Sequence, residues 1–344
     1  MLAAVGLFVL GLALLALGGD SIVKGASGLA QRFGLTPFVT GLVLVAFATS
    51  LPELAVNLMA ILHDQGELAL GNAVGSNVAN IGLTLGVAAL TAPIVVRWRS
   101  LSPLLVVLVL GTVAVLVLGA DGTLSRAEGV GLLLVFVAVF AYALARSRHE
   151  APELRAEIAD YAQTSHMLGL NVFRFAIGAV LLWIGSTLIV GGAGVTLFGL
   201  DLSEAGAAFI GKGMGLSPVL TGLLPVAIGT ALPEIAAAVA AARRGQGDMV
   251  VGHVIGASVF NILVIVGGMA ALGSLALPMT TMGLPPLTGT FALPLGYELL
   301  PALAFALMLY PVLRGDVRVS RNEGVFLLVA YMAWVVFELF LIGK

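Results

Sequence analysis

The sequence predicts an all-α polytopic membrane protein, with about ten transmembrane helices arranged as two inverted five-helix repeats. Composition gives the first reason, because 60% of the 344 residues are hydrophobic, 10% are charged and the mean hydropathy is +1.12. A soluble domain carries about 25% charged residues, so too few polar side chains are present here to cover a soluble globule. The net charge of −2 gives no reason to expect a nucleic-acid partner, and the absence of cysteine excludes thiolate chemistry.

Apolar runs long enough to cross a bilayer form two sets, one on each side of a polar segment of mixed charge. The runs lie near residues 2–30, 37–62, 68–90, 102–119 and 127–145, and near residues 169–195, 217–242, 249–271, 292–312 and 323–341. The first run is too long for a cleaved signal peptide. We therefore expect an N-terminal repeat (residues 1–145), a short cytoplasmic connector (146–167) and a C-terminal repeat (168–344).

The distribution of positive charge predicts the orientation, because lysine and arginine concentrate in cytoplasmic loops. An extracytoplasmic N-terminus leaves only Arg126, Lys212 and Lys344 of the 16 lysines and arginines outside. An even number of spans then places the C-terminus outside as well. The short connector leaves no room for a regulatory domain, which favours a prokaryotic plasma membrane.

An internal repeat is the second reason for the predicted fold. At a shift of 181 residues, 23 of the 57 positions starting at Gly34 are identical to those starting at Gly215. The densest matches are TGLVLVAFATSLPEL (40–54) with TGLLPVAIGTALPEI (221–235), and GNAVGSNVANI (71–81) with GHVIGASVFNI (252–262). Because each half has an odd number of spans, the second enters the membrane from the opposite side, which is typical of alternating-access transporters.

A carboxylate lies near the middle of a span in each half, at Glu53 and Glu234. Thr49 and Ser50 precede Glu53 by four and three residues, so their hydroxyls share its helix face, and Thr230 corresponds to Thr49. A proline directly before each glutamate lacks an N–H group and frees carbonyls of the preceding turn. Free carbonyls inside a membrane need a partner, and a cation is one.

The following span supplies further oxygens, with Ser76 and Asn80 in the first half and Asn261 in the second. Inverted symmetry brings the two glutamates together near the midplane, where carboxylate, hydroxyl, amide and carbonyl oxygens suit Ca²⁺ or Na⁺. Two carboxylates about 5 Å apart at an effective dielectric constant of about 20 repel by roughly 3 kcal/mol. Without a cation, one of them is therefore expected to bind a proton.

Several of these residues also have purely structural interpretations. Hydroxyls can bond back to the preceding turn, and buried asparagines can join helices. Two GxxxG patterns indicate close helix packing, four histidines without metal-ligand spacing are expected at the interface or in solvent, and Asp20 with Lys24 is expected to form a local ion pair. The glycines are Gly71, Gly75, Gly252 and Gly256, and the histidines are His63, His149, His166 and His253.

These motifs resemble the sodium/calcium exchanger family of the cation/calcium antiporter superfamily, whose two α-repeats carry a G-T-S-x-P-E-like helix and a G-N-x-x-G-S-N-x-x-N/D-like helix. The resemblance implies ten transmembrane helices, a central ion site and sliding of the first and sixth helices. It implies that Glu53 and Glu234 are the principal Ca²⁺ and Na⁺ ligands. The surrounding ligands it implies are Thr49, Thr230, Ser50, Ser76, Asn80, Asn261 and the carbonyls of Ala46 and Ala227.

The second half departs from the family pattern. Ala231 and Ala257 replace serines, His253 replaces an asparagine, and Asn261 stands where some members have aspartate. The two missing hydroxyls weaken one sodium site, so a calcium/proton antiporter, or one for another cation, is the alternative to sodium/calcium exchange.

Other functional classes lack their motifs. The sequence has no HExxH, no GxSxG with a paired histidine and no P-loop, which argues against an enzyme and against ATP-driven pumping. A channel fits less well than an antiporter, because internal pseudo-symmetry and broken helices favour alternating access. The expected partners are inorganic cations and the lipid bilayer, with no cofactor and no evident protein partner.

Overall fold

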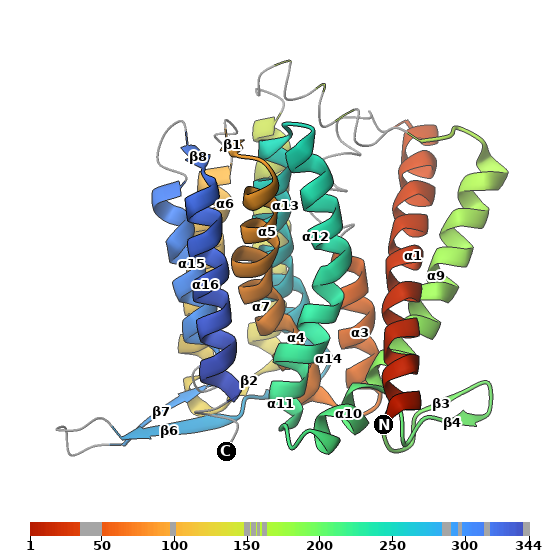
Figure 1. Cartoon of the computed structure of the whole chain (residues 1–344), viewed down its shortest axis with the longest axis vertical. Helices are drawn as coiled ribbons and strands as arrows, with labels where there is room; N and C mark the ends of the chain where they lie inside the picture. The colour runs from red at the N-terminus through yellow and green to blue at the C-terminus, as the bar shows by residue number, and fades with distance from the viewer. Residues whose placement is uncertain are drawn as a thin grey trace.

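The structure is a computed structural model that describes residues 1–34, 50–96, 101–147, 164–283, 290–294, 298–312 and 317–339, with Pro152, Ala156 and Ala159. The described chain forms a bundle of long helices (Figure 1). In the first half these are α1 (Leu2–Arg32), α3 (Leu51–Leu62), α4 (Gly66–Ala79), α5 (Gly86–Thr91), α6 (Leu101–Leu118) and α7 (Arg126–Ser147). In the second half they are α9 (Leu168–Val190), α10 (Gly206–Gly213), α11 (Pro218–Thr221), α12 (Ala227–Arg243), α13 (Gly247–Phe260), α14 (Gly267–Leu272), α15 (Leu299–Val312) and α16 (Arg321–Phe337).

Within these ranges, seven helices are long and apolar enough to cross a membrane, and α3 and Leu299–Leu309 of α15 are shorter apolar helices. Three of the seven contain a π-helical segment, namely η2 (Asn80–Leu85), η4 (Gly222–Val226) and η5 (Asn261–Val266). A 3-10 turn, η3 (Gly119–Asp121), follows α6. The predicted helical polytopic fold is confirmed.

One predicted span begins too early. The apolar run from residue 292 is not helical at its start, because β7 (Thr290–Pro294) pairs antiparallel with β6 (Met279–Gly283). Threonines on both strands favour extended structure, and Pro294 would break a helix at this place. The span therefore starts seven residues later, at Leu299.

Short antiparallel pairs join segments at the two ends of the bundle. β1 (Ile94–Val96) pairs with β8 (Val317–Val319), and β2 (Thr123–Leu124) pairs with β5 (Leu275–Ala276). The first pair lies at the end of the bundle opposite the N-terminus, and β2 lies near the N-terminal end (Figure 1). Both pairs connect the two halves of the chain.

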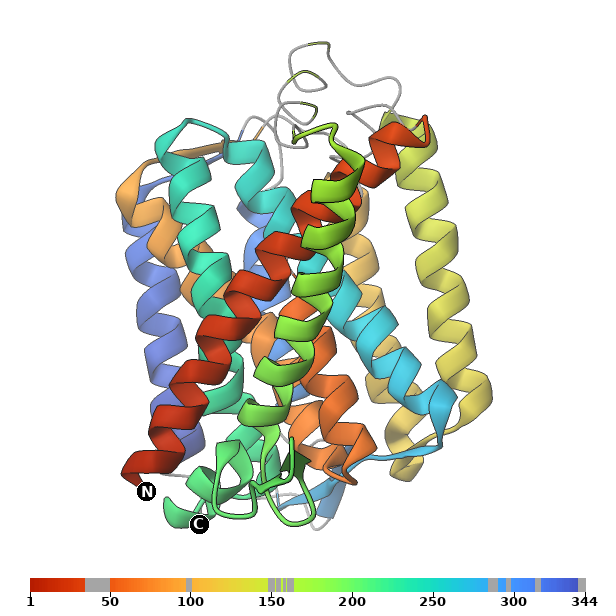
Figure 2. The ribbon, with the colours of Figure 1, turned by 90° about the vertical axis from the view of Figure 1, so that its right-hand side faces the viewer.

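The inverted repeat is visible in the helix directions. Helices α1 and α9 run antiparallel, side by side at one edge of the molecule (Figures 1 and 2). Glycines allow close contact, because a Cβ on Gly11 would lie 2.9 Å from the carbonyl oxygen of Gly185, and one on Gly18 at the same distance from that of Gly178. The pair therefore packs backbone against backbone.

Local details repeat at the same shift of 181 residues. The segments η2 and η5 begin at Asn80 and Asn261. The turn that follows the glutamate-bearing helix has a left-handed residue in both halves, Asp64 with φ of 56° and Gly245 with φ of 75°. The two halves therefore share a backbone design as well as sequence.

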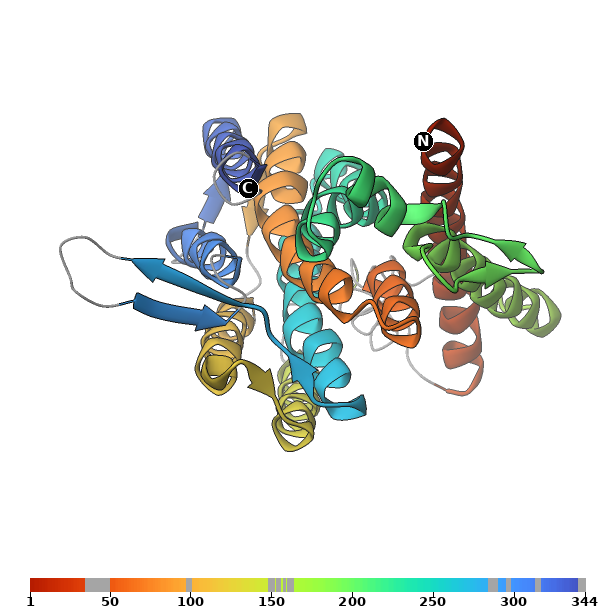
Figure 3. The ribbon, with the colours of Figure 1, turned by 90° about the horizontal axis from the view of Figure 1, so that it is seen from below.

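The core is built around α4 and α13, which lie near the middle of the bundle when it is seen from one end (Figure 3). Every residue from Leu68 to Ala79 of α4 is buried, and so is every residue of α13. A Cβ on Gly71 would clash with the carbonyl of Val219, and one on Gly75 with that of Leu223. The predicted close packing at the first GxxxG pattern is confirmed.

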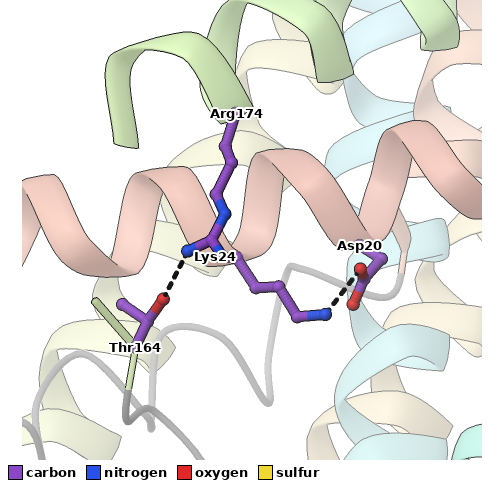
Figure 4. A network of polar contacts seen from close by, with 4 residues as sticks. All are labelled: Asp20, Lys24, Thr164 and Arg174. Carbon is purple, nitrogen blue, oxygen red and sulfur yellow. Dashed lines mark hydrogen bonds and ion pairs between the residues drawn. The ribbon is translucent and has the colours of Figure 1, made fainter. Parts of the chain in front are cut away.

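Asp20 and Lys24 form the predicted ion pair on the surface of α1, with Oδ2 of Asp20 2.7 Å from Nζ of Lys24 (Figure 4). Nearby, Arg174 of α9 donates a hydrogen bond to the hydroxyl of Thr164 at 3.2 Å. Both contacts are peripheral to the core.

The segment that is longer in the second half, residues 191–215, folds as a hairpin of β3 (Thr196–Leu197) and β4 (Leu200–Asp201) followed by α10. It lies at the end of the bundle where the chain begins (Figure 1).

Candidate functional site

Two glutamates from the two halves of the chain lie together in the core. Glu53 on α3 is 1% exposed and Glu234 on α12 is 2% exposed. The helices that carry them, α3 and α12, contact each other. Among the described residues, neither carboxylate pairs with a lysine or arginine, and none of their four oxygens has a hydrogen-bond partner.

The first half has further buried polar side chains on α4, which packs against α3, and next to the start of α3. Ser50 directly precedes α3 but does not cap it, so its buried hydroxyl is not used by the helix. Ser76 on α4 and Asn80 at the start of η2 are also buried. The polar side-chain atoms of all three have no hydrogen-bond partner in the part of the chain that the structure describes.

The second half contributes Thr230, Ala227 and Asn261. The hydroxyl of Thr230 donates to the carbonyl of Ala227 at 3.3 Å and lies beside the carboxylate of Glu53. This is the hydrogen bond to the preceding turn that a threonine in a helix can form, and it coexists with the contact to Glu53. Ala231 and Ala257 are fully buried where the first half has Ser50 and Ser76.

Two predicted ligands, Thr49 and the carbonyl of Ala46, lie outside the described residues. The free carbonyls expected near residues 44–49 lie outside them too. In the second half the equivalent region is described, and there the π-helical segment η4 contains Pro225 and leads into α12, which continues through Pro233.

Amide groups join the two halves beside the carboxylates. Asn77 on α4 donates from Nδ2 to the carbonyl of Ser258 on α13 at 3.3 Å. Its Oδ1 accepts a hydrogen bond from Nδ2 of Asn261 at 3.1 Å. Asn261 thus acts as the interhelical connection that the sequence left open, while its own Oδ1 remains without a partner among the described residues. Asn77 and Ser258 occupy equivalent positions in the repeat, which is the signal that could have identified them.

The halves differ one turn away from the glutamates. In the first half Asn72 on α4 donates to Oδ1 of Asn57 on α3 at 3.0 Å. The equivalent residues are His253 and Ala238. His253 is 7% exposed, and its Nε2 lies 3.9 Å from Oε1 of Glu234. The expectation of a solvated or interfacial histidine is therefore wrong for His253, because α13 is buried along its whole length.

A cavity of about 1180 Å³ lies at the end of the bundle where the chain begins. It is bounded by the turn between α3 and α4, by α10 and α11, and by the residues after α14. Its charged lining residues are Asp64, Glu67 and Lys212. Ile61 of α3 also lines the cavity, eight residues or about 12 Å along the helix from Glu53.

The chemistry of this centre follows from its unpaired oxygens. Taking a carboxylate out of water costs several kcal/mol, and buried polar atoms are normally hydrogen-bonded. Carboxylate, hydroxyl and amide oxygens gathered without protein donors match the ligands of Na⁺ and Ca²⁺. No group of three histidine, aspartate or glutamate side chains gathers in the described ranges, so the arrangement differs from a typical transition-metal centre.

An inverted repeat with paired carboxylates at its centre is characteristic of a secondary transporter of cations. A family profile described as "Sodium/calcium exchanger protein" matches residues 3–145 and 170–340. The chain is 34% identical to the inner membrane protein YrbG of Escherichia coli, with 97% of this chain and 96% of the relative aligned. It is 29% identical to the sodium/calcium exchanger MaX1 of Methanosarcina acetivorans over 96% and 97% of the two chains.

Solved structures agree. A structure of the sodium-calcium exchanger NCX_Mj soaked with Na⁺ and Sr²⁺ matches with a TM-score of 0.62 and 27% identity, covering 97% of this chain and 98% of the other. The chain belongs to the sodium/calcium exchanger family. It is a multi-pass membrane protein and a cation antiporter.

Proposed function

We propose that this antiporter exchanges Na⁺ for Ca²⁺ by alternating access, with the two ions competing for the Glu53/Glu234 centre. The observation that carries the proposal is the pair of buried carboxylates, contributed by both halves and without a lysine or arginine partner in the described chain. One Ca²⁺ neutralises such a pair, and Na⁺ can use the surrounding hydroxyl and amide oxygens. The proposed ligands are Glu53, Glu234, Ser50, Ser76, Asn80, Asn261, Thr230, Thr49 and the carbonyls of Ala46 and Ala227.

The helix pair α1/α9 is proposed as the moving element. Gly11 and Gly18 of α1 pack against the backbone of α9, so the pair can shift as one body against the remaining helices. The cavity at the N-terminal end is proposed as the outward entrance, because its lining includes two acidic residues and reaches the helix that carries Glu53. The predicted location is the plasma membrane, which is the inner membrane in a bacterium that also has an outer membrane. Both termini are predicted to be extracytoplasmic.

Ca²⁺ uptake into proteoliposomes tests the proposal. Vesicles loaded with Na⁺ and diluted into Na⁺-free buffer are expected to take up Ca²⁺. Glu53→Gln or Glu234→Gln is expected to reduce uptake to background, because each variant removes one of the two negative charges that neutralise the divalent ion. Glu204→Gln, an exposed acidic residue outside both the centre and the cavity lining, is the matched control and should retain exchange. Transport near the parent rate in either glutamine variant of the centre would refute the site.

A calcium/proton antiporter is the second candidate, supported by the alanines at 231 and 257. A parallel set of vesicles with a pH gradient and no Na⁺ distinguishes the two. Uptake driven only by the pH gradient would assign the proton as the counter-ion, and uptake in neither set would mean that another cation is transported.

A further inference from the structure

His253 places a nitrogen atom beside a central carboxylate. Its Nε2 lies 3.9 Å from Oε1 of Glu234, and the two side chains are 9% and 2% exposed. Neither atom has a hydrogen-bond partner among the residues that the structure describes. The imidazole nitrogen and the carboxylate oxygen can each donate an electron pair to a metal ion.

The separation of the two atoms is informative. At 3.9 Å it is too long for a direct hydrogen bond. Two donors that each bind one cation at about 2.0–2.5 Å lie roughly 3–4 Å apart when they occupy neighbouring positions around it. The spacing therefore fits two ligands of one ion.

The repeat explains why the imidazole is available. In the first half the equivalent Asn72 is engaged by Asn57 at 3.0 Å. In the second half Ala238 replaces Asn57, so that partner is missing, and α13 directs His253 towards Glu234. The second half also lacks the two hydroxyls that Ser50 and Ser76 provide in the first. A nitrogen donor is thus present in the half that has lost oxygen donors.

We propose that Glu234 and His253 form a nitrogen-containing subsite through which this antiporter accepts divalent transition-metal cations in addition to Ca²⁺. The inference rests on the proposed function, in which Glu234 binds the transported ion. Imidazole nitrogen favours ions such as Co²⁺ and Zn²⁺, whereas Ca²⁺ and Sr²⁺ bind oxygen. No second histidine joins this pair in the described chain, so the metal would complete its shell with oxygens of the centre and could still be released.

Competition against Na⁺-driven Ca²⁺ uptake tests the subsite, with Co²⁺ as the nitrogen-accepting competitor and Sr²⁺ as the oxygen-binding one. In the parent, Co²⁺ is expected to inhibit at lower concentration than Sr²⁺. His253→Asn restores the residue found at the equivalent position and should weaken Co²⁺ inhibition by about tenfold, with Sr²⁺ inhibition nearly unchanged. His63→Asn is the matched control, because His63 bonds the carbonyl of Met59 on its own helix and lies outside the centre.

The visible absorption of bound Co²⁺ provides a readout that does not require transport. Purified parent protein should give a spectrum with nitrogen ligation, and His253→Asn should shift it to that of an all-oxygen site. An unshifted spectrum, or an unchanged ratio of Co²⁺ to Sr²⁺ inhibition, would overturn the subsite. Ca²⁺ exchange that persists in Glu53→Gln would instead refute the central site itself, so the two failures are distinguishable.

Discussion

Ser50 and Ser76 have alanines as their repeat partners, so the two halves of the centre offer a cation different sets of oxygens. The two serines and the two alanines are fully buried, so bulk solvent does not reach positions 231 and 257 to take the place of the missing hydroxyls. Na⁺ depends on neutral oxygens, whereas a divalent ion gains most from the two carboxylates. In the proposed exchange, the carboxylate pair that would bind Ca²⁺ is therefore better preserved than the set of hydroxyls that Na⁺ would use.

Restoring the missing hydroxyls should strengthen sodium binding. In Ala231→Ser/Ala257→Ser we expect a Na⁺ concentration for half-maximal exchange several-fold lower, or a steeper dependence on Na⁺, because each serine adds a neutral oxygen ligand. The measurement is Na⁺-dependent Ca²⁺ efflux from proteoliposomes over a range of Na⁺ concentrations.

The reciprocal variant Ser50→Ala/Ser76→Ala is the control for this experiment and should shift the Na⁺ dependence in the opposite direction. Sodium curves that coincide in the parent and the serine variant would show that positions 231 and 257 do not contribute ligands in this protein.

At the scale of elements, close helix contact positions the centre. Helix α4 carries Ser76 and Asn77 and leads directly into η2, which begins at Asn80. The distance of α4 from the second half is set by Gly71 and Gly75 against the backbone of α11 and η4. The segments η2 and η5 start at Asn80 and Asn261, and π-helical turns commonly occur at functional sites. A shift of α4 and η2 would therefore move two of the proposed ligands, Ser76 and Asn80, together.

Gly75→Ala should destabilise the protein, because the new methyl group would meet the backbone of Leu223 on the facing segment. Overpacking of this kind costs about 1–3 kcal/mol, so we expect a lower midpoint of thermal unfolding in detergent, followed by tryptophan fluorescence. Gly268→Ala in α14 is the matched control, because its Cβ would have no atom within 4 Å, and it should leave the midpoint unchanged or raise it. Equal midpoints for the two variants would contradict tight packing at Gly75.

At the scale of the whole molecule, basic helix ends gather on one side. Helix α1 ends at Arg32, α12 ends at Arg243 and α16 begins at Arg321. These three ends lie at the end of the bundle opposite the N-terminus (Figure 1). Because lysine and arginine are retained on the cytoplasmic side, this end is predicted to face the cytoplasm.

Single cysteines can test this orientation, since the chain has none of its own. Ser203→Cys, in the exposed segment after β4, should react with a membrane-impermeant maleimide on intact cells. Arg244→Cys, exposed at the other end of the bundle, should react only after the membrane is permeabilised. The opposite pattern of labelling would reverse the predicted topology.

Much of the fold could be predicted from the sequence. The length of each apolar run predicts a span, and the match between residues 34–90 and 215–271 predicts the inverted repeat. Both signals depend on residue identities alone and not on contacts. The strand β7 was missed because a run of apolar residues has the same composition in a strand and at the start of a helix. Only the pairing with β6, which depends on a distant segment, distinguishes them.

The sequence by itself determined the membrane class, the repeat and the two glutamates, because hydrophobic length, odd span number and residue identity require no knowledge of contacts. The tertiary structure decided which side chains meet. Asn77 joins Ser258 and Asn261 across more than 180 positions, Asn72 turns to Asn57, and His253 turns to Glu234. These contacts depend on how closely the buried helices α4 and α13 approach their neighbours, and that distance is set by packing in three dimensions.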